Sequence, residues 1–116
     1  MVKQGVGMDK GFEERKRKYE EKWALDAELR FKATARRNKL LGRWAAVEIG
    51  LSADKVEDYA RAVVTADLHE PGGDAAFRKV KDDLLAAGRQ HTDAELLDKL
   101  AEFSEQARRQ IVEGKA

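Results

Sequence analysis

Apolar residues recur along this chain at the three- and four-residue spacing of α-helices, in four separate stretches. The first stretch extends without a proline over about residues 12–49. Turn residues separate it from further stretches at about 53–69, 75–87 and 93–112. Because short connections favour antiparallel neighbours, the pattern predicts an all-α fold in which residues 12–116 form a single four-helix bundle domain.

The apolar positions of each stretch define an expected core. In the first helix, Phe12, Tyr19 and Trp23 share one face, and the stripe continues further along through Leu40, Trp44 and Val47 or Glu48. The inward positions expected in the three later helices are Val56, Tyr59, Ala60, Val63, Val64, Phe77, Val80, Leu84, Leu96, Leu100, Phe103, Ala107 and Ile111.

Residues typical of helix ends mark the expected boundaries. Gly50 and Gly88 suit helix C-termini, where a left-handed backbone is common. Ser52 and Asp74 are expected to cap the N-termini of the second and third helices. Residues 92–95 read Thr-Asp-Ala-Glu, a capping box in which each of the two end side chains bonds the other's backbone N–H.

The first helix is long for a domain of this size. An unbroken helix over 12–49 would measure about 57 Å, which exceeds the core that the rest of the chain can offer. We therefore expect its front part to be mobile or to project, since an unpacked helix gains little stability. Residues 1–11 contain glycines and no helical periodicity, and we expect a disordered tail there.

Composition limits the chemistry and reveals an uneven charge. There is no cysteine, so disulfides and thiolate sites are excluded, and no apolar run is long enough to span a bilayer. The net charge of +1 hides an asymmetry: residues 1–43 hold 13 Lys/Arg and 7 Asp/Glu, net +6, whereas residues 44–116 hold 10 and 15, net −5. A basic half joined to an acidic half indicates an interaction surface at the front.

Nothing in the sequence indicates catalysis. His69 and His91 lie near predicted helix ends and outside any metal-ligand spacing. The adjacent carboxylates at 57–58 and 82–83 point about 100° apart on a helix, so neither pair forms an acid–base dyad. We expect a protein that is not an enzyme and uses no cofactor or metal.

A basic cluster on the first helix admits three interpretations; its residues are Arg36, Arg37, Asn38, Lys39 and Arg43. The cations can pair with carboxylates of the second helix or the acidic half. They can bind a phosphate-bearing ligand such as a nucleotide, because arginine forks suit phosphate oxygens. Nucleic acid is disfavoured, because the domain is nearly neutral and no aromatic residues are interleaved with the cluster.

The front segment alternates acidic and basic residues around its aromatic stripe. It can pack the stripe on its own bundle, or present it to a partner, for which aromatic and arginine anchors are well suited. The residues expected to contact a partner are Phe12, Glu14, Arg15, Lys18, Tyr19, Lys22 and Trp23.

Residues 35–46 read ARRNKLLGRWAA, and this segment resembles the signature of the zeta-type inhibitor subunits of alphaproteobacterial F-type ATP synthases. The similarity covers about residues 12–112. Further similar positions are Phe12, Arg15, Glu20, Lys22, Asp26, Glu28, Phe31 and Lys32 in the front segment, and 58–61, 63–64, 66–67, 70–72 and 78–80 beyond it. Lys16, Tyr19 and Trp23 depart from the residues usual in that family.

The resemblance implies a four-helix bundle that inhibits ATP hydrolysis. In this view residues 12–25 are the inhibitory segment and insert between the catalytic subunits and the rotor of the ATPase head, formed by its alpha, beta and gamma subunits. The protein would be cytoplasmic, peripheral at the inner face of the plasma membrane through the ATP synthase, and a monomer when free, without nucleic acid or membrane insertion. The alternative is a nucleotide- or phosphate-binding regulatory bundle without inhibitory activity.

Overall fold

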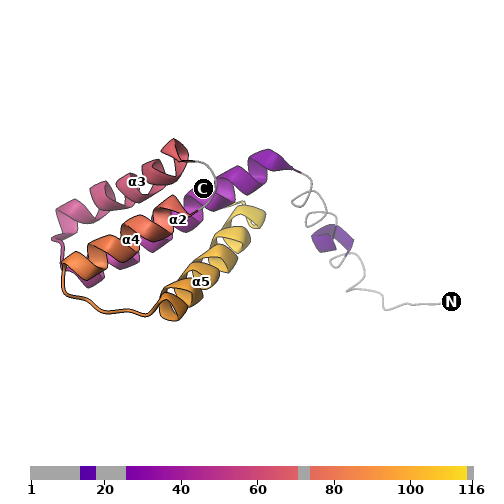
Figure 1. Ribbon diagram of the computed structural model, residues 1–116. Helices are drawn as coiled ribbons and strands as arrows, with labels where there is room; N and C mark the ends of the chain where they lie inside the picture. Colours follow the sequence, from indigo (N-terminus) through magenta and orange to yellow (C-terminus); the bar gives the residue numbers. More distant parts are fainter. Residues whose placement is uncertain (1–13, 18–25, 71–73, 115–116) are drawn as a thin grey trace. The chain divides into compact units, whose positions relative to one another are not determined.

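A computed structural model describes residues 14–17, 26–70 and 74–114 of the chain. Four helices follow one another: α2 (Ala27–Ile49), α3 (Ala53–His69), α4 (Ala75–Ala86) and α5 (Asp93–Val112) (Figure 1). Residues 14–17 are also helical, and the described parts contain no strand. The all-α prediction is confirmed. The expected tail at 1–11 lies outside the described residues, as does most of the front segment whose mobility was predicted.

The start of α2 departs from the prediction of one helix over 12–49. Asp26 is not helical, and its Oδ1 accepts hydrogen bonds from the backbone N–H groups of Glu28 at 2.9 Å and Leu29 at 3.3 Å. A carboxylate that satisfies the free N–H groups of a first turn defines a helix N-terminus. The prediction of an unbroken helix from residue 12 is therefore wrong at Asp26.

Both predicted glycine stops are confirmed. Gly50 has φ 92°, and the next N–H, that of Leu51, donates to the carbonyl of Ala46 at 3.0 Å. Gly88 has φ 76°, and the N–H of Arg89 donates to the carbonyl of Leu84 at 2.8 Å. A glycine adopts this left-handed backbone without a Cβ clash, so each helix ends there and its last carbonyls are satisfied.

The predicted N-caps have mixed outcomes. The capping box of α5 is present: Thr92 Oγ1 accepts from the N–H of Glu95 at 3.1 Å, and Glu95 Oε1 accepts from the N–H of Thr92 at 2.7 Å. Ser52 and Asp74 hold the N-cap positions of α3 and α4, but neither side chain caps its helix. The Ser52 hydroxyl instead donates to Asp54, and Asp74 pairs with Arg78 at 3.6 Å, because these charged neighbours compete with the backbone.

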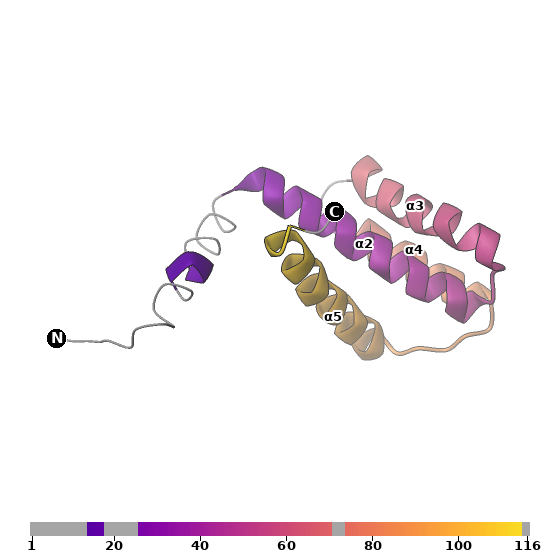
Figure 2. The ribbon, with the colours of Figure 1, turned by 180° about the vertical axis from the view of Figure 1, so that it is seen from behind.

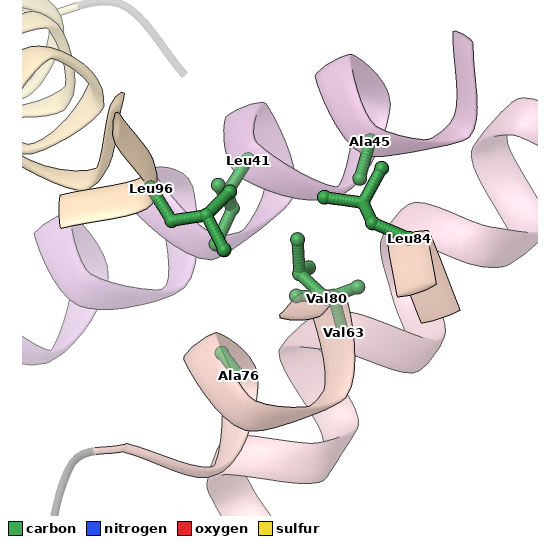
Figure 3. Packing of buried hydrophobic residues seen from close by; sticks show 7 residues of the cluster. All are labelled: Leu41, Ala45, Val63, Ala76, Val80, Leu84 and Leu96. Carbon is green, nitrogen blue, oxygen red and sulfur yellow. The ribbon is translucent and has the colours of Figure 1, made fainter. Parts of the chain in front are cut away.

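The core lies where α2, α3, α4 and α5 meet, within the compact unit Ala33–Ala116. In Figures 1 and 2, α3 and α5 lie on opposite sides of α2 and α4. Figure 3 shows that all four helices contribute to one buried cluster: Leu41, Ala45, Val63, Ala76, Val80, Leu84 and Leu96. Of the expected core residues, Tyr59, Phe77, Leu100 and Phe103 are partly buried against this cluster.

The buried face of α2 is not the predicted one. Small residues and one asparagine form it, namely Asn38, Leu41, Gly42, Ala45 and Ala46, whereas Val47 is 66% exposed and Trp44 is only partly buried. The reason is close approach, because a Cβ added at Gly42 would lie 2.7 Å from the Cα of Ala60 in α3. A bulky side chain would not fit at this crossing, and Trp44 instead lies against α5, with its ring centroid 5.6 Å from Lys99 Nζ.

The connection from α4 to α5 is attached to the C-terminus of α2. Arg89 Nε donates to the backbone carbonyl of Glu48 at 2.8 Å, and His91 Nε2 lies 3.2 Å from the Glu48 carboxylate. α2 has no basic residue in its last turn. Arg89, from a distant connection, therefore supplies the positive charge that a helix C-terminus favours.

Candidate functional site

The predicted partner-contacting segment is described at residues 14–17 only. Glu14 and Arg15 lie there with Lys16 and Arg17 on a helical, exposed stretch. The other predicted contact residues lie outside the described residues: Phe12, Lys18, Tyr19, Lys22 and Trp23. The described part presents three cations to solvent, and the role of the whole segment stays a prediction.

The basic cluster of α2 does not converge on one point. Arg36 reaches α5, where its Nη1 donates to Gln110 Oε1 at 3.3 Å. Arg37 and Arg43 both turn toward α3, but they meet carboxylates at different levels of that helix. These side chains are close together in the sequence, but in the fold they point toward different partners because α2 packs between its neighbours.

Arg43 forms a two-pronged ion pair with Glu57 on the surface. Its Nε donates to Oε2 at 2.8 Å and its Nη2 to Oε1 at 3.1 Å. The hydrogen bond from Arg43 lowers the pKa of Glu57 below its ordinary value, and the charges of Arg43, Lys39 and Arg61 act in the same direction. The pair joins α2 to α3, but water screens it on both sides.

A second contact between α2 and α3 is more deeply buried. Arg37 Nη2 lies 3.9 Å from Asp67 Oδ2, and Arg37 Nε donates to Asn38 Oδ1 at 3.0 Å. Asn38 is only 1% exposed. Burial lowers the pKa of Arg37, and the charge of Asp67 partly opposes this shift. The other oxygen of Asp67, Oδ1, is buried and has no hydrogen-bond partner among the described residues.

This inner network of Arg37, Asn38 and Asp67 does not follow from the sequence pattern alone. The available signal was the spacing of Asn38, Leu41, Gly42, Ala45 and Ala46, which follows the i, i+3, i+4 rule of a buried helix face. The asparagine at the start of that row also lies within the basic cluster in the sequence, which conceals its place in the core. Its burial beside Arg37 and Asp67 indicates a polar contact that orients α2 on α3.

These contacts favour the first interpretation of the cluster, in which its cations pair within the fold. Each of the three guanidinium groups already bonds a side chain of another helix. A phosphate site requires such groups to point at a common oxygen cluster. The phosphate or nucleotide interpretation of Arg36, Arg37 and Lys39 therefore stays a prediction that the observed geometry does not favour.

No group of three or more His, Cys, Asp or Glu side chains able to hold a metal ion occurs among the described residues. Within the described ranges no helix is both long and apolar enough to cross a bilayer. His69 is exposed in the last turn of α3, where a cation is favourable, and His91 packs against Trp44 with ring centroids 5.4 Å apart.

Exposed basic segments often bind a partner, and residues 14–17 expose three cations. The comparison with protein families agrees. The model of the family described as ATPase inhibitor subunit zeta matches residues 8–110, and the chain belongs to that family. No curated protein matched the chain.

Proposed function

We propose that this protein inhibits ATP hydrolysis by the F-type ATP synthase, and that residues 12–25 insert at the interface between the catalytic subunits and the rotor of the head. The observation that carries the proposal is the family match over residues 8–110, which includes both the front segment and the helical unit. The alpha, beta and gamma subunits are the proposed partners.

The proposed mechanism is differential binding. The head changes shape at each rotational step, and a segment that fits one state better than the next stabilises that state and stalls hydrolysis. Phe12, Tyr19 and Trp23 would anchor the segment, because large aromatic side chains dominate binding energy at interfaces. Arg15, with the neighbouring lysines and Glu14, would pair with charged groups of the head. The exposure of the described residues 14–17 supports this role for Arg15.

The helical unit would act as the support of the inhibitory segment. Its core joins α2 to α3, α4 and α5, and we interpret this arrangement as the four-helix bundle expected of the family. α2 begins at Ala27, directly after the proposed segment, with Asp26 as its N-cap. The protein would be a cytoplasmic monomer when free and would reach the inner face of the plasma membrane through the ATP synthase.

The decisive experiment is a titration of ATP hydrolysis by the purified ATPase head with the full chain and with a chain lacking residues 1–25. We expect inhibition by the full chain and none by the truncated one. The point variants are Arg15→Ala and, as a matched control, Arg61→Ala, since Arg61 is an exposed arginine of α3 that pairs with Asp58. Arg15→Ala should weaken inhibition and Arg61→Ala should not.

Two results would contradict the proposal. Undiminished inhibition by the truncated chain would place the inhibitory contact in the helical unit. No inhibition by the full chain, at concentrations where it binds the head, would show that the fold occurs here without the inhibitory activity. The nucleotide-binding alternative would then be tested next, by adding ADP to the labelled chain and following the amide signals of Arg36, Arg37 and Lys39.

A further inference from the structure

A hollow of about 330 Å³ lies on the surface between α2 and α5. Six residues line it: Trp44, His91, Glu95, Asp98, Lys99 and Glu102. Its volume is at the lower end of the range of ligand pockets, about 300–1,000 Å³. None of the residues of the basic cluster on α2 lines it, so its chemistry is separate from that cluster.

The aromatic wall of the hollow already receives a cation. Lys99 Nζ lies 5.6 Å from the ring centroid of Trp44 and 5.8 Å from that of Phe103, within cation–π distance. Glu102 Oε1 holds the same ammonium at 3.2 Å. The contacts of Lys99 therefore indicate that the Trp44 ring accommodates a cationic group that is paired with a neighbouring carboxylate.

The lining carries more negative than positive charge. Three carboxylates, those of Glu95, Asp98 and Glu102, face one ammonium, that of Lys99. Glu95 is engaged in the capping box of α5 and Glu102 in its bond to Lys99. The Asp98 side chain is exposed and makes no ion pair or hydrogen bond with any described residue. The Asp98 carboxylate can therefore form an ion pair with a second cation.

His91 lies between a carboxylate of α2 and a carboxylate of α5. Its Nε2 faces Glu48 of α2 at 3.2 Å and its Nδ1 lies 3.9 Å from Glu95. His91 thus adds one further carboxylate to the surroundings, that of Glu48, and packs its ring on Trp44. The environment of the indole remains acidic on the side of α5.

We propose that this hollow binds an arginine side chain presented by a segment of a partner protein. The guanidinium would replace the Lys99 ammonium over the Trp44 indole, and its N–H fork would pair with Asp98 and Glu102. Arginine suits the site better than lysine, because a planar guanidinium stacks on an aromatic face while its edge pairs with carboxylates. The inference concerns a surface outside residues 12–25 and does not depend on the inhibitory role proposed above.

The small energy of a single cation–π contact favours a protein segment, and not a free cation, as the ligand of the hollow. A cation–π contact at an exposed site contributes only about 0.5–1 kcal/mol, which is too little to hold a free small cation. Within a larger interface the same contact fixes the register of the partner, because a wrong pairing leaves carboxylates unmatched.

The test is a titration of the full ¹⁵N-labelled chain with a short glycine peptide that contains arginines, followed through the indole N–H signal of Trp44. A peptide with citrulline in place of arginine is the control, since citrulline has the same shape and no charge. We expect the arginine peptide to shift the Trp44 indole and the Asp98 amide, and the citrulline peptide to leave both unchanged.

Pairs of variants with equal changes in charge distinguish binding in this hollow from general electrostatic attraction to the protein surface. Asp98→Asn should weaken binding by up to about fivefold, the factor of one lost exposed ion pair. Asp82→Asn, on the exposed surface of α4, should leave it unchanged. Lys99→Met should tighten binding, because it removes the internal competitor for the indole, whereas Lys55→Met on α3 should not.

Three outcomes would overturn the proposal. Equal weakening by Asp98→Asn and Asp82→Asn would mean that the peptide binds acidic surface in general. Free arginine amide binding as tightly as the peptide would make this a small-cation site. Self-association of the chain that Asp98→Asn abolishes would identify the occupant as a second copy. Because no ATPase is present, failure here would leave the inhibitory function untested and unaffected.

Discussion

Gly42 and Ala60 bring α2 and α3 into backbone contact, whereas α2 and α5 meet through Trp44, Lys99 and the Arg36–Gln110 bond. The first contact consists of small side chains and leaves no room. The second consists of long and aromatic side chains and leaves a hollow beside the indole. Close-packed small residues define how the helices cross, and large residues at an open edge are available to a partner.

The largest effect is expected where the core is densest. Leu41 is 1% exposed in the shared cluster, and Leu41→Ala should lower the free energy of unfolding by about 2–5 kcal/mol through lost burial and a cavity. Leu97→Ala is the control, because Leu97 on α5 is 53% exposed and should change stability by less than about 0.5 kcal/mol. Urea unfolding measures both. Similar losses at the two sites would contradict the contrast between the helices.

Gly42→Ala tests the crossing of α2 and α3 directly. Alanine favours a helix over glycine by about 1 kcal/mol, so on propensity alone the variant should be more stable. We expect a net loss of about 1–3 kcal/mol instead, since the new methyl group would lie 2.7 Å from the backbone of Ala60.

A second variant sharpens the same prediction. Ala60→Gly should not rescue Gly42→Ala, because the close atom at 2.7 Å is the Ala60 Cα and its Cβ lies further away at 3.3 Å. Thermal unfolding of both single variants and the double variant measures the coupling. Full rescue would mean that the Ala60 side chain, and not the backbone, limits the approach.

Tyr59 joins α3 to α4, and its loss should have an intermediate effect. Its hydroxyl donates to Asp83 Oδ2 at 2.8 Å, and burial, followed by this bond, raises the pKa of Tyr59 above its ordinary value. Tyr59→Phe should cost about 1 kcal/mol at pH 7.

The same pKa shift predicts a pH dependence. Because the folded chain holds the phenol proton more tightly, the stability that Tyr59 contributes is complete below its unfolded pKa of about 10 and is lost as pH rises beyond it. The stability difference between the parent chain and Tyr59→Phe should therefore shrink above about pH 10. Denaturant unfolding at several alkaline pH values measures it. A constant difference would contradict the assignment.

The smallest effect is expected at the exposed pair of Arg43 and Glu57. Glu57→Gln should leave the melting temperature nearly unchanged at neutral pH, because water screens the pair. The lowered pKa of Glu57 means that its contribution is present above its ordinary pKa and disappears as pH falls below it. Melting curves at neutral and acidic pH check this. A large loss at pH 7 would show that the pair organises the α2–α3 contact.

Local sequence signals located the helices more reliably than they located the core. α3 and α5 begin and end at the predicted residues, and the glycine stops and the Thr92–Glu95 box occur as expected. These features depend on residues a few positions apart. The caps expected from Ser52 and Asp74 failed, because each side chain has a charged neighbour in the next turn.

The contacts of the candidate site likewise could not be predicted from local sequence signals. The sequence singled out Arg36, Arg37 and Arg43, but it could not assign their partners Gln110, Asp67 and Glu57, which lie on other helices. The sequence also could not predict that Trp44 lies beside residues of α5. Such contacts depend on which face of each helix turns inward, and that depends on the packing of the whole unit.

The sequence by itself determined the helical class, most helix boundaries and, through the segment from Ala35 to Ala46, the family. Periodicity, glycine stops and capping residues act over one or two turns, so they can be interpreted without the fold. The tertiary structure decided that the small face of α2 is buried, that its arginines separate and that an acidic hollow forms beside Trp44. These outcomes follow from how closely two backbones can approach, which the neighbours of a residue in space determine.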